Sequence, residues 1–170
     1  MTPDGEVPDD NPYPDSLVYS SGHRNPQGLA WSEDGTLFAT EFGQDTWDEL
    51  NVITKGGNYG WPGVEGKSEQ FNSMYIDPVQ QWDPDDASPS GMTIAENTIY
   101  IANLRGERIR AVPVAAPETG RDLFVGEFGR VRDVAVAGDG SLWLVTNNTD
   151  GRGDVRDGDD RIKRVTVPSS

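Results

Sequence analysis

The chain repeats one local plan three times: an apolar strand, a polar turn and a second apolar strand. The three copies span residues 28–41, 91–103 and 133–147. Asp34-Gly35 and Asp139-Gly140 are strong hairpin signals, because glycine accepts the positive φ that such turns require. Between the copies, further strands are expected at residues 49–55, 108–114, 122–125 and 161–167.

Repeats spaced about 40 to 60 residues apart, each with room for about four short strands, are typical of β-propeller blades. A β-sandwich also has short strands and regular turns, but it does not predict the same strand–turn–strand sequence pattern three times. We therefore expect an all-β chain of about three propeller blades, folded as a single domain over residues 1–170. Four prolines mark residues 1–16 as a proline-rich lead-in loop, and the first strand is expected near residues 17–19.

Three blades leave a propeller open. A closed ring needs about four blades or more, and an arc exposes unpaired strand edges and an apolar sheet face at each end. Two explanations stay open: the chain is half of a longer, six-bladed propeller whose N-terminal half completes the ring, or a second copy closes it. Trp31, Phe38, Tyr100 and Trp143 recur in the repeat strands, and we expect them in the blade core rather than in a sugar-stacking platform.

The composition excludes several classes of partner. The chain has 29 acidic and 14 basic residues, a net charge of −15, so its surface would repel phosphate and we expect no nucleic-acid partner. This balance indicates either a well-solvated acidic surface or adaptation to high salt. No apolar run is long enough for a membrane span, and the first residues lack the pattern of a signal peptide. With no cysteine, disulfides and thiolate metal sites are impossible.

Three polar clusters precede strands or lie in the adjoining loops. Residues 23–28 offer a guanidinium, an imidazole and amides, which suit a ligand with carboxylate and carbonyl oxygens. Residues 41–51 combine carboxylates with glycine, as calcium loops do, and residues 129–133 place two arginines two positions apart. A hydrogen-bonded loop, a solvated acidic loop and surface arginines are the plain alternatives. Their shared position at strand ends favours one ligand site near the propeller channel.

The order of these motifs resembles that of the glucose/sorbosone dehydrogenase family. The resemblance rests on residues 19–30 (YSSGHRNPQGLA), 41–43 (EFG), 48–51 (DELN), 56–62 (GGNYGWP), 89–92 (PSGM), 130–133 (RVRD) and 159–162 (DDRI). It is collinear and covers essentially the whole chain. It implies a soluble, six-bladed propeller that uses pyrroloquinoline quinone (PQQ) and calcium to oxidise aldose sugars to lactones, in an extracellular or periplasmic location.

The resemblance also implies residue roles. Arg24, Asn25 and Gln27 would hydrogen-bond the quinone, and Arg130 and Arg132 would bind its carboxylates. Where relatives place a lysine against the quinone, this chain has Arg105, which keeps the charge in a bulkier shape.

Four further positions are implied to bind calcium. The backbone carbonyls of Gly43 and Gln44 would hold the ion that polarises the quinone, with Gln44 standing where relatives have proline. Glu49 and the carbonyl of Tyr59 would hold a second, structural ion.

The resemblance also points to a missing group. The family's general base, a histidine, lies in the N-terminal half, and His23 is the only histidine here. We therefore expect no catalytic residue in this chain and no activity when it is alone. The alternative is a non-catalytic propeller module that binds a ligand or partner and closes its ring by self-association.

Overall fold

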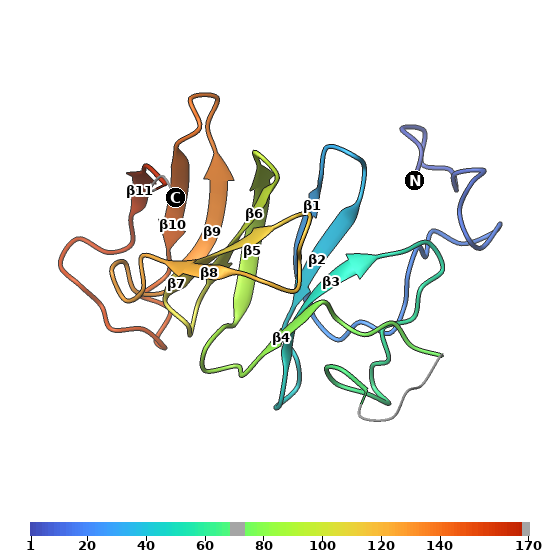
Figure 1. The fold of residues 1–170 in the computed structure, drawn as a ribbon, viewed down its shortest axis with the longest axis horizontal. Helices are drawn as coiled ribbons and strands as arrows, with labels where there is room; N and C mark the ends of the chain where they lie inside the picture. The colour runs from blue at the N-terminus through green and yellow to red at the C-terminus, as the bar shows by residue number, and fades with distance from the viewer. Residues whose placement is uncertain (69–73, 168–170) are drawn as a thin grey trace.

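The computed structural model describes residues 1–68 and 74–167. The described residues form eleven antiparallel strands in three sheets and no helix (Figure 1). The strands of the first two sheets are β1 (Pro26–Trp31), β2 (Leu37–Glu41), β3 (Asp48–Ile53), β4 (Gln80–Trp82), β5 (Pro89–Ala95), β6 (Thr98–Asn103), β7 (Arg108–Pro113) and β8 (Arg121–Leu123). The third sheet contains β9 (Val131–Val136), β10 (Leu142–Thr146) and β11 (Ile162–Val165).

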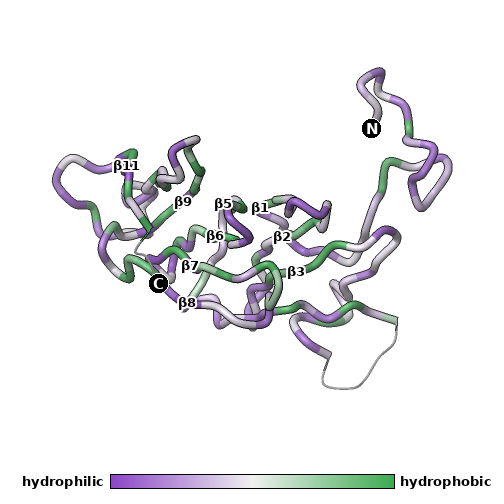
Figure 2. Tube along the Cα trace, turned by 45° about the horizontal axis from the view of Figure 1, so that its top comes forward, coloured by the Kyte–Doolittle hydropathy of each residue, from purple (hydrophilic) through white to green (hydrophobic). Residues whose placement is uncertain are grey.

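Each sheet is a meander in which neighbours in sequence are neighbours in space. The first strands of the sheets, β1, β5 and β9, lie side by side, and the later strands extend outward from them (Figure 1). This arrangement confirms the expected half propeller of about three blades. Most loops between the strands are polar, as Figure 2 shows, whereas the strands carry the apolar side chains.

Two apolar cores hold the blades together, because strand residues alternate between the two faces of a sheet. Phe38 and Leu50 of the first sheet pack with Ile99 and Ile101 of the second. The opposite face of the second sheet packs on the third through a cluster made of Tyr100, Ala102, Ile109, Ala111, Leu123, Val131, Val134, Leu142 and Leu144.

Most expected strands are confirmed, since β3, β7, β8 and β11 fall within two residues of the ranges inferred from sequence. The short strand β4 was not predicted. The strand expected at residues 17–19 is wrong: this segment runs beside the loop after β3 instead of joining a sheet. The amide of Gly56 donates to the carbonyl of Tyr19 at 2.8 Å, and that of Tyr59 donates to Ser21 at 2.9 Å.

Of the four aromatic residues expected in the blade core, two are buried and two are exposed. Phe38 and Tyr100 are 1% and 8% exposed, but Trp31 and Trp143 are 62% and 43% exposed. The two tryptophans lie on the outer faces of the first and third sheets, where the described chain offers no further blade to cover them.

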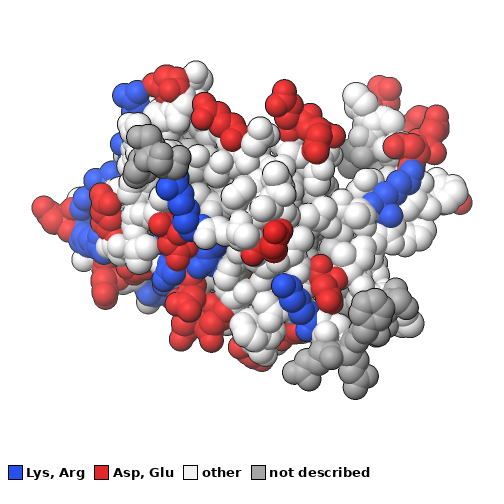
Figure 3. Space-filling view, in the orientation of Figure 1, with Lys and Arg blue, Asp and Glu red and all other residues white. Residues whose placement is uncertain are grey.

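Acidic side chains are spread widely over the face shown in Figure 3, and most of the basic ones on that face lie over its left half, with others at the lower centre and at the right. Among the described residues, no helical segment has the length and hydropathy needed to cross a membrane.

Candidate functional site

The meander topology brings the three polar clusters to one end of the blades. In such a sheet, the start of the first strand and the loop between the second and third strands lie at the same end. The lower edge of Figure 1 therefore holds the segment before β1 at 22–25 and the loop after β2 at 42–47. The loop at 104–107 and the segment at 147–161 lie along the same edge. Segments far apart in sequence meet there.

A cavity of about 270 Å³ opens at this end between β1, β5 and β9. The polar residues of its lining are Gln27, Ser90, Arg132 and Asp133. The Nε2 of Gln27 donates to the Oδ1 of Asn25 at 2.8 Å, which fixes the orientation of the glutamine amide. The Oγ of Ser90 is buried and has no hydrogen-bond partner among the described residues. Arg132 gives the cavity a guanidinium and Gln27 an amide, which suit a ligand with carboxylate and carbonyl oxygens, and Asp133 adds a carboxylate to the same lining.

Gly91 keeps this cavity open. A β-carbon at Gly91 would lie 1.8 Å from the Oδ1 of Asp133, so a side chain there would push β9 away from β5. We expect Gly91→Ala to lower stability and to abolish any ligand binding in the cavity. Gly138→Ala is the matched control, because a β-carbon at Gly138 meets nothing within 4 Å. Equal melting temperatures and equal ligand affinities for the two variants would contradict this assignment.

The other arginines implied to bind the quinone lie in different surroundings. The guanidinium of Arg130 is buried and donates to Asp150 at 3.0 Å, and its Nε has no partner among the described residues. Arg130 does not line the cavity that Arg132 lines, so the two arginines do not face one shared space. Arg130 precedes β9, which begins at Val131, so the alternation of side chains along that strand does not set its direction. Arg105 is exposed and pairs with Asp85.

A second, narrow cavity lies against the calcium-loop residues. Its lining includes Gly43, Glu49 and Tyr59, three of the four positions implied to bind calcium, together with Glu41 and Glu65. Gly43 has no room for a side chain, because a β-carbon would lie 1.9 Å from the carbonyl oxygen of Trp47. The structure therefore brings these positions together.

Glu65 orders the loop at residues 44–47. Its Oε1 accepts backbone hydrogen bonds from Asp45, Thr46 and Trp47 at 2.7 to 3.0 Å. Burial alone would raise the pKa of Glu65, but these donors outweigh it and hold the pKa below its ordinary value. The loop is thus fixed by a charged acceptor rather than by proline.

Glu41 joins the two clusters of the first blade. Its carboxylate accepts from the backbone N–H of Arg24 at 2.8 Å and from the Nδ2 of Asn51 at 2.9 Å, and it contacts the Nδ1 of His23 at 2.9 Å. The other ring nitrogen of His23 contacts the Oγ of Ser20 at 2.9 Å, and the ring stacks on Tyr59. Both nitrogens of the imidazole are therefore engaged within the loop.

Arg24 faces the loop that follows β2. Its Nε donates to the Oε1 of Gln44 at 3.0 Å, its Nη1 donates to the carbonyl of Phe42 at 3.3 Å, and its guanidinium lies over the ring of Trp61. Gln44 thus ties its loop to the arginine through its side chain. This contact restrains the loop at the position where the family resemblance implies a stiffer proline.

The carboxylates near this loop are unusually buried. Burial raises the pKa of Glu49 and the pKa of Asp48 above their ordinary values, and backbone and amide donors offset this only in part. Within residues 1–68 and 74–167, no group of three or more histidine, aspartate or glutamate side chains is arranged to hold a metal ion.

The sequence predicted no individual role for several residues that shape the site: Glu41, Asn51, Ser90, Asp133, Asn148 and Asp150. Asn148 is fully buried, accepts from the amide of Arg130 at 2.8 Å and donates to the carbonyl of Phe128 at 3.0 Å. Its only signal in the sequence is its position after a strand. Glu41 lay within a motif that carried the resemblance and could have been found by asking which acid faces the arginine loop.

Propeller blades that share a polar cavity and a carboxylate-rich loop at one end have the layout of a ligand-binding propeller. Within that class, the sequence model described as "Glucose / Sorbosone dehydrogenase" matches residues 1–156. The chain belongs to this family.

Relatives support the assignment. The chain is 30% identical to the aldose sugar dehydrogenase YliI of Escherichia coli, over 89% of this chain and 48% of that protein. It is 48% identical to quinoprotein glucose dehydrogenase B of Acinetobacter calcoaceticus over 75 residues, 42% of this chain and 16% of that protein. The solved PQQ-bound aldose sugar dehydrogenase of Streptomyces coelicolor superposes with a TM-score of 0.88 and 56% identity, over 96% of this chain and 49% of that chain. The chain thus spans about half the length of the first and third of these proteins.

Proposed function

We propose that this chain is the cofactor-binding half of a PQQ- and calcium-dependent enzyme that oxidises aldose sugars to lactones. The observation that carries this proposal is the cavity lined by Gln27, Ser90 and Arg132 at the shared end of the blades. PQQ is a polycarboxylate with quinone carbonyls, so the guanidinium of Arg132 and the amide of Gln27 match its oxygens. When bound, PQQ would accept the hydride that leaves C1 of the sugar.

The remaining assignments are part of the same proposal. Asn25 positions Gln27, Arg24 links the quinone corner to the loop of Gly43 and Gln44, and Arg130 and Arg105 supply positive charge from the neighbouring blades. Calcium would be held by the carbonyls of Gly43 and Gln44, and a second ion by Glu49 and the carbonyl of Tyr59. We place the enzyme outside the cytoplasm, in an extracellular or periplasmic location, with residues 1–170 as one domain behind the lead-in loop at 1–16.

No side chain of the chain is proposed as the catalytic base. Both nitrogens of His23 are engaged by Glu41 and Ser20, so His23 orders the loop instead of accepting a proton from a sugar. Calorimetric titration of the chain with PQQ at millimolar calcium tests the cofactor site, and aldose-dependent reduction of the quinone tests activity. We expect binding without turnover. Turnover by the chain would contradict the absence of a catalytic base. A failure to bind PQQ would favour the alternative, a non-catalytic propeller module.

Calcium and pH are expected to act on the same carboxylates. The raised pKa of Glu49 means that the folded chain binds its proton at a pH where the unfolded chain has released it, above the ordinary value of 4.5. Stability therefore falls as pH rises through this range. Carboxyls with a lowered pKa act in a more acidic range. Asp139, with a pKa of about 2, loses its contribution to stability only as pH falls below 3.8. We expect the calcium-free chain to melt higher near pH 5 than at pH 7.

Calcium should remove this difference by compensating the carboxylate at pH 7. Melting curves with chelator or with millimolar calcium, recorded in high salt to suppress general charge repulsion, provide the measurement. Glu49→Gln is the informative variant, and it should respond less to both calcium and pH. A wild-type melting temperature that does not change with calcium would argue against the ion site.

We also propose that the acidic surface is an adaptation to high salt. With a net charge of −15, the folded chain repels itself, and this repulsion is screened as the Debye length shortens from about 10 Å at 0.1 M salt to about 3 Å at 1 M. The melting temperature should therefore rise from low to molar KCl. A temperature that is flat or falls over this range would favour an ordinary solvated acidic surface.

A further inference from the structure

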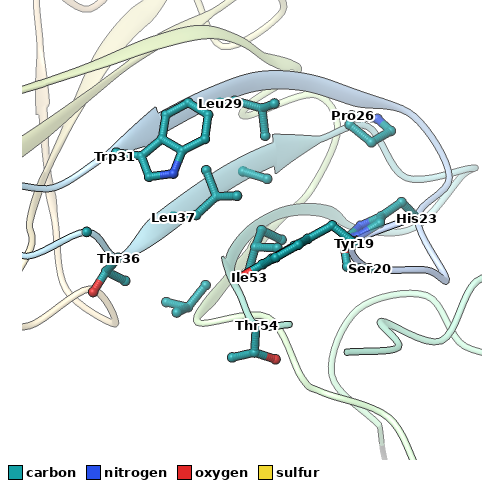
Figure 4. Close-up of a pocket in the computed structure, with 13 residues that line it drawn as sticks. Tyr19, Ser20, His23, Pro26, Leu29, Trp31, Thr36, Leu37, Ile53 and Thr54 are labelled. Carbon is teal, nitrogen blue, oxygen red and sulfur yellow. Dashed lines mark hydrogen bonds between the residues drawn. The ribbon is translucent and has the colours of Figure 1, made fainter. Parts of the chain in front are cut away.

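Two larger hollows lie away from the cavity assigned to the quinone. One, of about 720 Å³, lies against β1 and β2, and Figure 4 shows Leu29, Trp31 and Leu37 along it with His23 at one end. Both ring nitrogens of His23 already have partners within the loop. This hollow therefore presents mainly apolar surface rather than unpaired hydrogen-bonding groups.

The other hollow, of about 620 Å³, lies between the second and third sheets. It opens beside the hairpins β5–β6 and β9–β10, at the upper end of Figure 1 and opposite the loops of the quinone corner. A smaller hollow of about 300 Å³ adjoins it on the second sheet, because Thr98, Tyr100 and Arg121 line both. We call the two together the hairpin groove. Both blades that enclose it belong to the described chain.

Tyr100 brings an unpaired hydroxyl to this groove. Its ring packs in the core between the second and third blades, and the residue is 8% exposed. Within residues 1–68 and 74–167 the hydroxyl has no hydrogen-bond partner, although a buried tyrosine hydroxyl usually has one. Phe38 occupies the matching repeat position in the first blade, so the core does not require this hydroxyl. Because Tyr100 lines both hollows, a ligand in the groove would supply the missing partner.

The rest of the lining mixes hydrogen-bond donors and acceptors. Arg121 is exposed and contributes a guanidinium, which only donates. Glu96 and Asp139 contribute carboxylates, and Asp139 is already paired with Arg164, so Glu96 is left to accept from a ligand. The carboxylates disfavour an anionic ligand, and the guanidinium disfavours a cationic one. The hydroxyls of a sugar both donate and accept, so they match this mixture and the hydroxyl of Tyr100.

We propose that the hairpin groove is a binding site for a neutral carbohydrate, separate from the quinone cavity. Tyr100 and Arg121 hydrogen-bond the hydroxyls of the sugar, and Glu96 accepts from them. The volumes of the two hollows, about 620 and 300 Å³, are those of small-molecule sites. This site goes beyond the proposed sugar oxidation and does not depend on quinone binding, so the two can fail separately.

Calorimetric titration of the 170-residue chain with glucose and with maltotriose, without quinone or calcium, tests the proposal. We expect saturable binding of at least one of them with a dissociation constant of about 1 mM, the equivalent of a few net hydrogen bonds. In the ¹⁵N-labelled chain, the sugar should shift the amide signals of Thr98, Tyr100 and Arg121. Gluconate is the anionic comparison, and it should bind more weakly than the neutral sugars.

Tyr100→Phe removes the hydroxyl and leaves the ring in place. The affinity for the sugar should fall about fivefold, the value of one neutral hydrogen bond. The melting temperature should not change, because the hydroxyl has no partner in the described part of the chain. Tyr13→Phe is the matched control: Tyr13 is 43% exposed in the lead-in loop, and its variant should change neither quantity.

Several results would overturn the proposal. Neither sugar might as well be absent if titration shows no saturable binding, and an affinity that Tyr100→Phe leaves unchanged would remove the hydroxyl from the site. A lower melting temperature for Tyr100→Phe would show that the hydroxyl serves the fold instead. Amide shifts confined to Gln27 and Arg132 would place the sugar in the quinone cavity, and tighter binding of gluconate would indicate an anion site.

Discussion

Replacing Arg132 by alanine is expected to weaken PQQ binding by about 10- to 100-fold, the equivalent of one or two hydrogen bonds to a charged group. Arg132 is exposed and lines the cavity between β1, β5 and β9, and the anionic quinone would meet its guanidinium there. The fold should be unaffected because the side chain is not part of either core. Calorimetric titration with PQQ at millimolar calcium gives the affinity.

The controls for this prediction use other arginines. Arg121→Ala removes an exposed arginine from the outer strand β8 and should leave the affinity unchanged. Arg105→Ala should have a smaller effect than Arg132→Ala, because Arg105 is already paired with Asp85. Equal losses for Arg132→Ala and Arg121→Ala would indicate a general charge effect and would contradict a quinone site in this cavity.

The second large effect concerns stability. Leu144→Ala is expected to lower the free energy of unfolding by about 2 to 5 kcal/mol, the range for truncating a fully buried leucine. Leu144 is 0% exposed and lies in the core between the second and third blades. Because neighbouring blades are joined mainly through such contacts, a cavity here weakens the attachment of the whole third blade.

Denaturant unfolding at a fixed protein concentration measures this loss. Leu17→Ala is the matched control, since Leu17 is 48% exposed in the segment before β1, and we expect a change of less than about 0.5 kcal/mol. A loss at Leu144 no larger than at Leu17 would show that the junction between the blades contributes little to stability.

Much of the fold could be predicted because the relevant signals are local. Hairpins at Asp34-Gly35 and Asp139-Gly140, and alternation in the repeat strands, depend on neighbouring residues only. The strand predicted at residues 17–19 was wrong because an apolar run does not identify the strand with which it would pair. The backbone of this segment instead forms hydrogen bonds with the loop after β3. Strand β4 was missed because three residues carry no recognisable period.

The candidate site was predicted as a set of residues but not as an arrangement. The sequence placed Arg130 and Arg132 two positions apart, and only the fold shows that Asp150 engages the first while the second lines the cavity. Likewise, Trp31 and Trp143 are aromatic residues of the repeat strands, as Phe38 is. Their burial depends on whether another blade lies beside them.

By itself, the sequence determined the blade repeat, the order of the polar clusters and the family resemblance, because each depends on residue identity and spacing along the chain. Tertiary structure alone decided which polar groups share a cavity, that Glu41 joins His23 to the backbone of Arg24, and which two apolar faces remain uncovered. Those features depend on contacts between segments 17 or more residues apart. Such contacts arise from strand pairing within a blade and from the packing of one blade on the next, which local patterns do not encode.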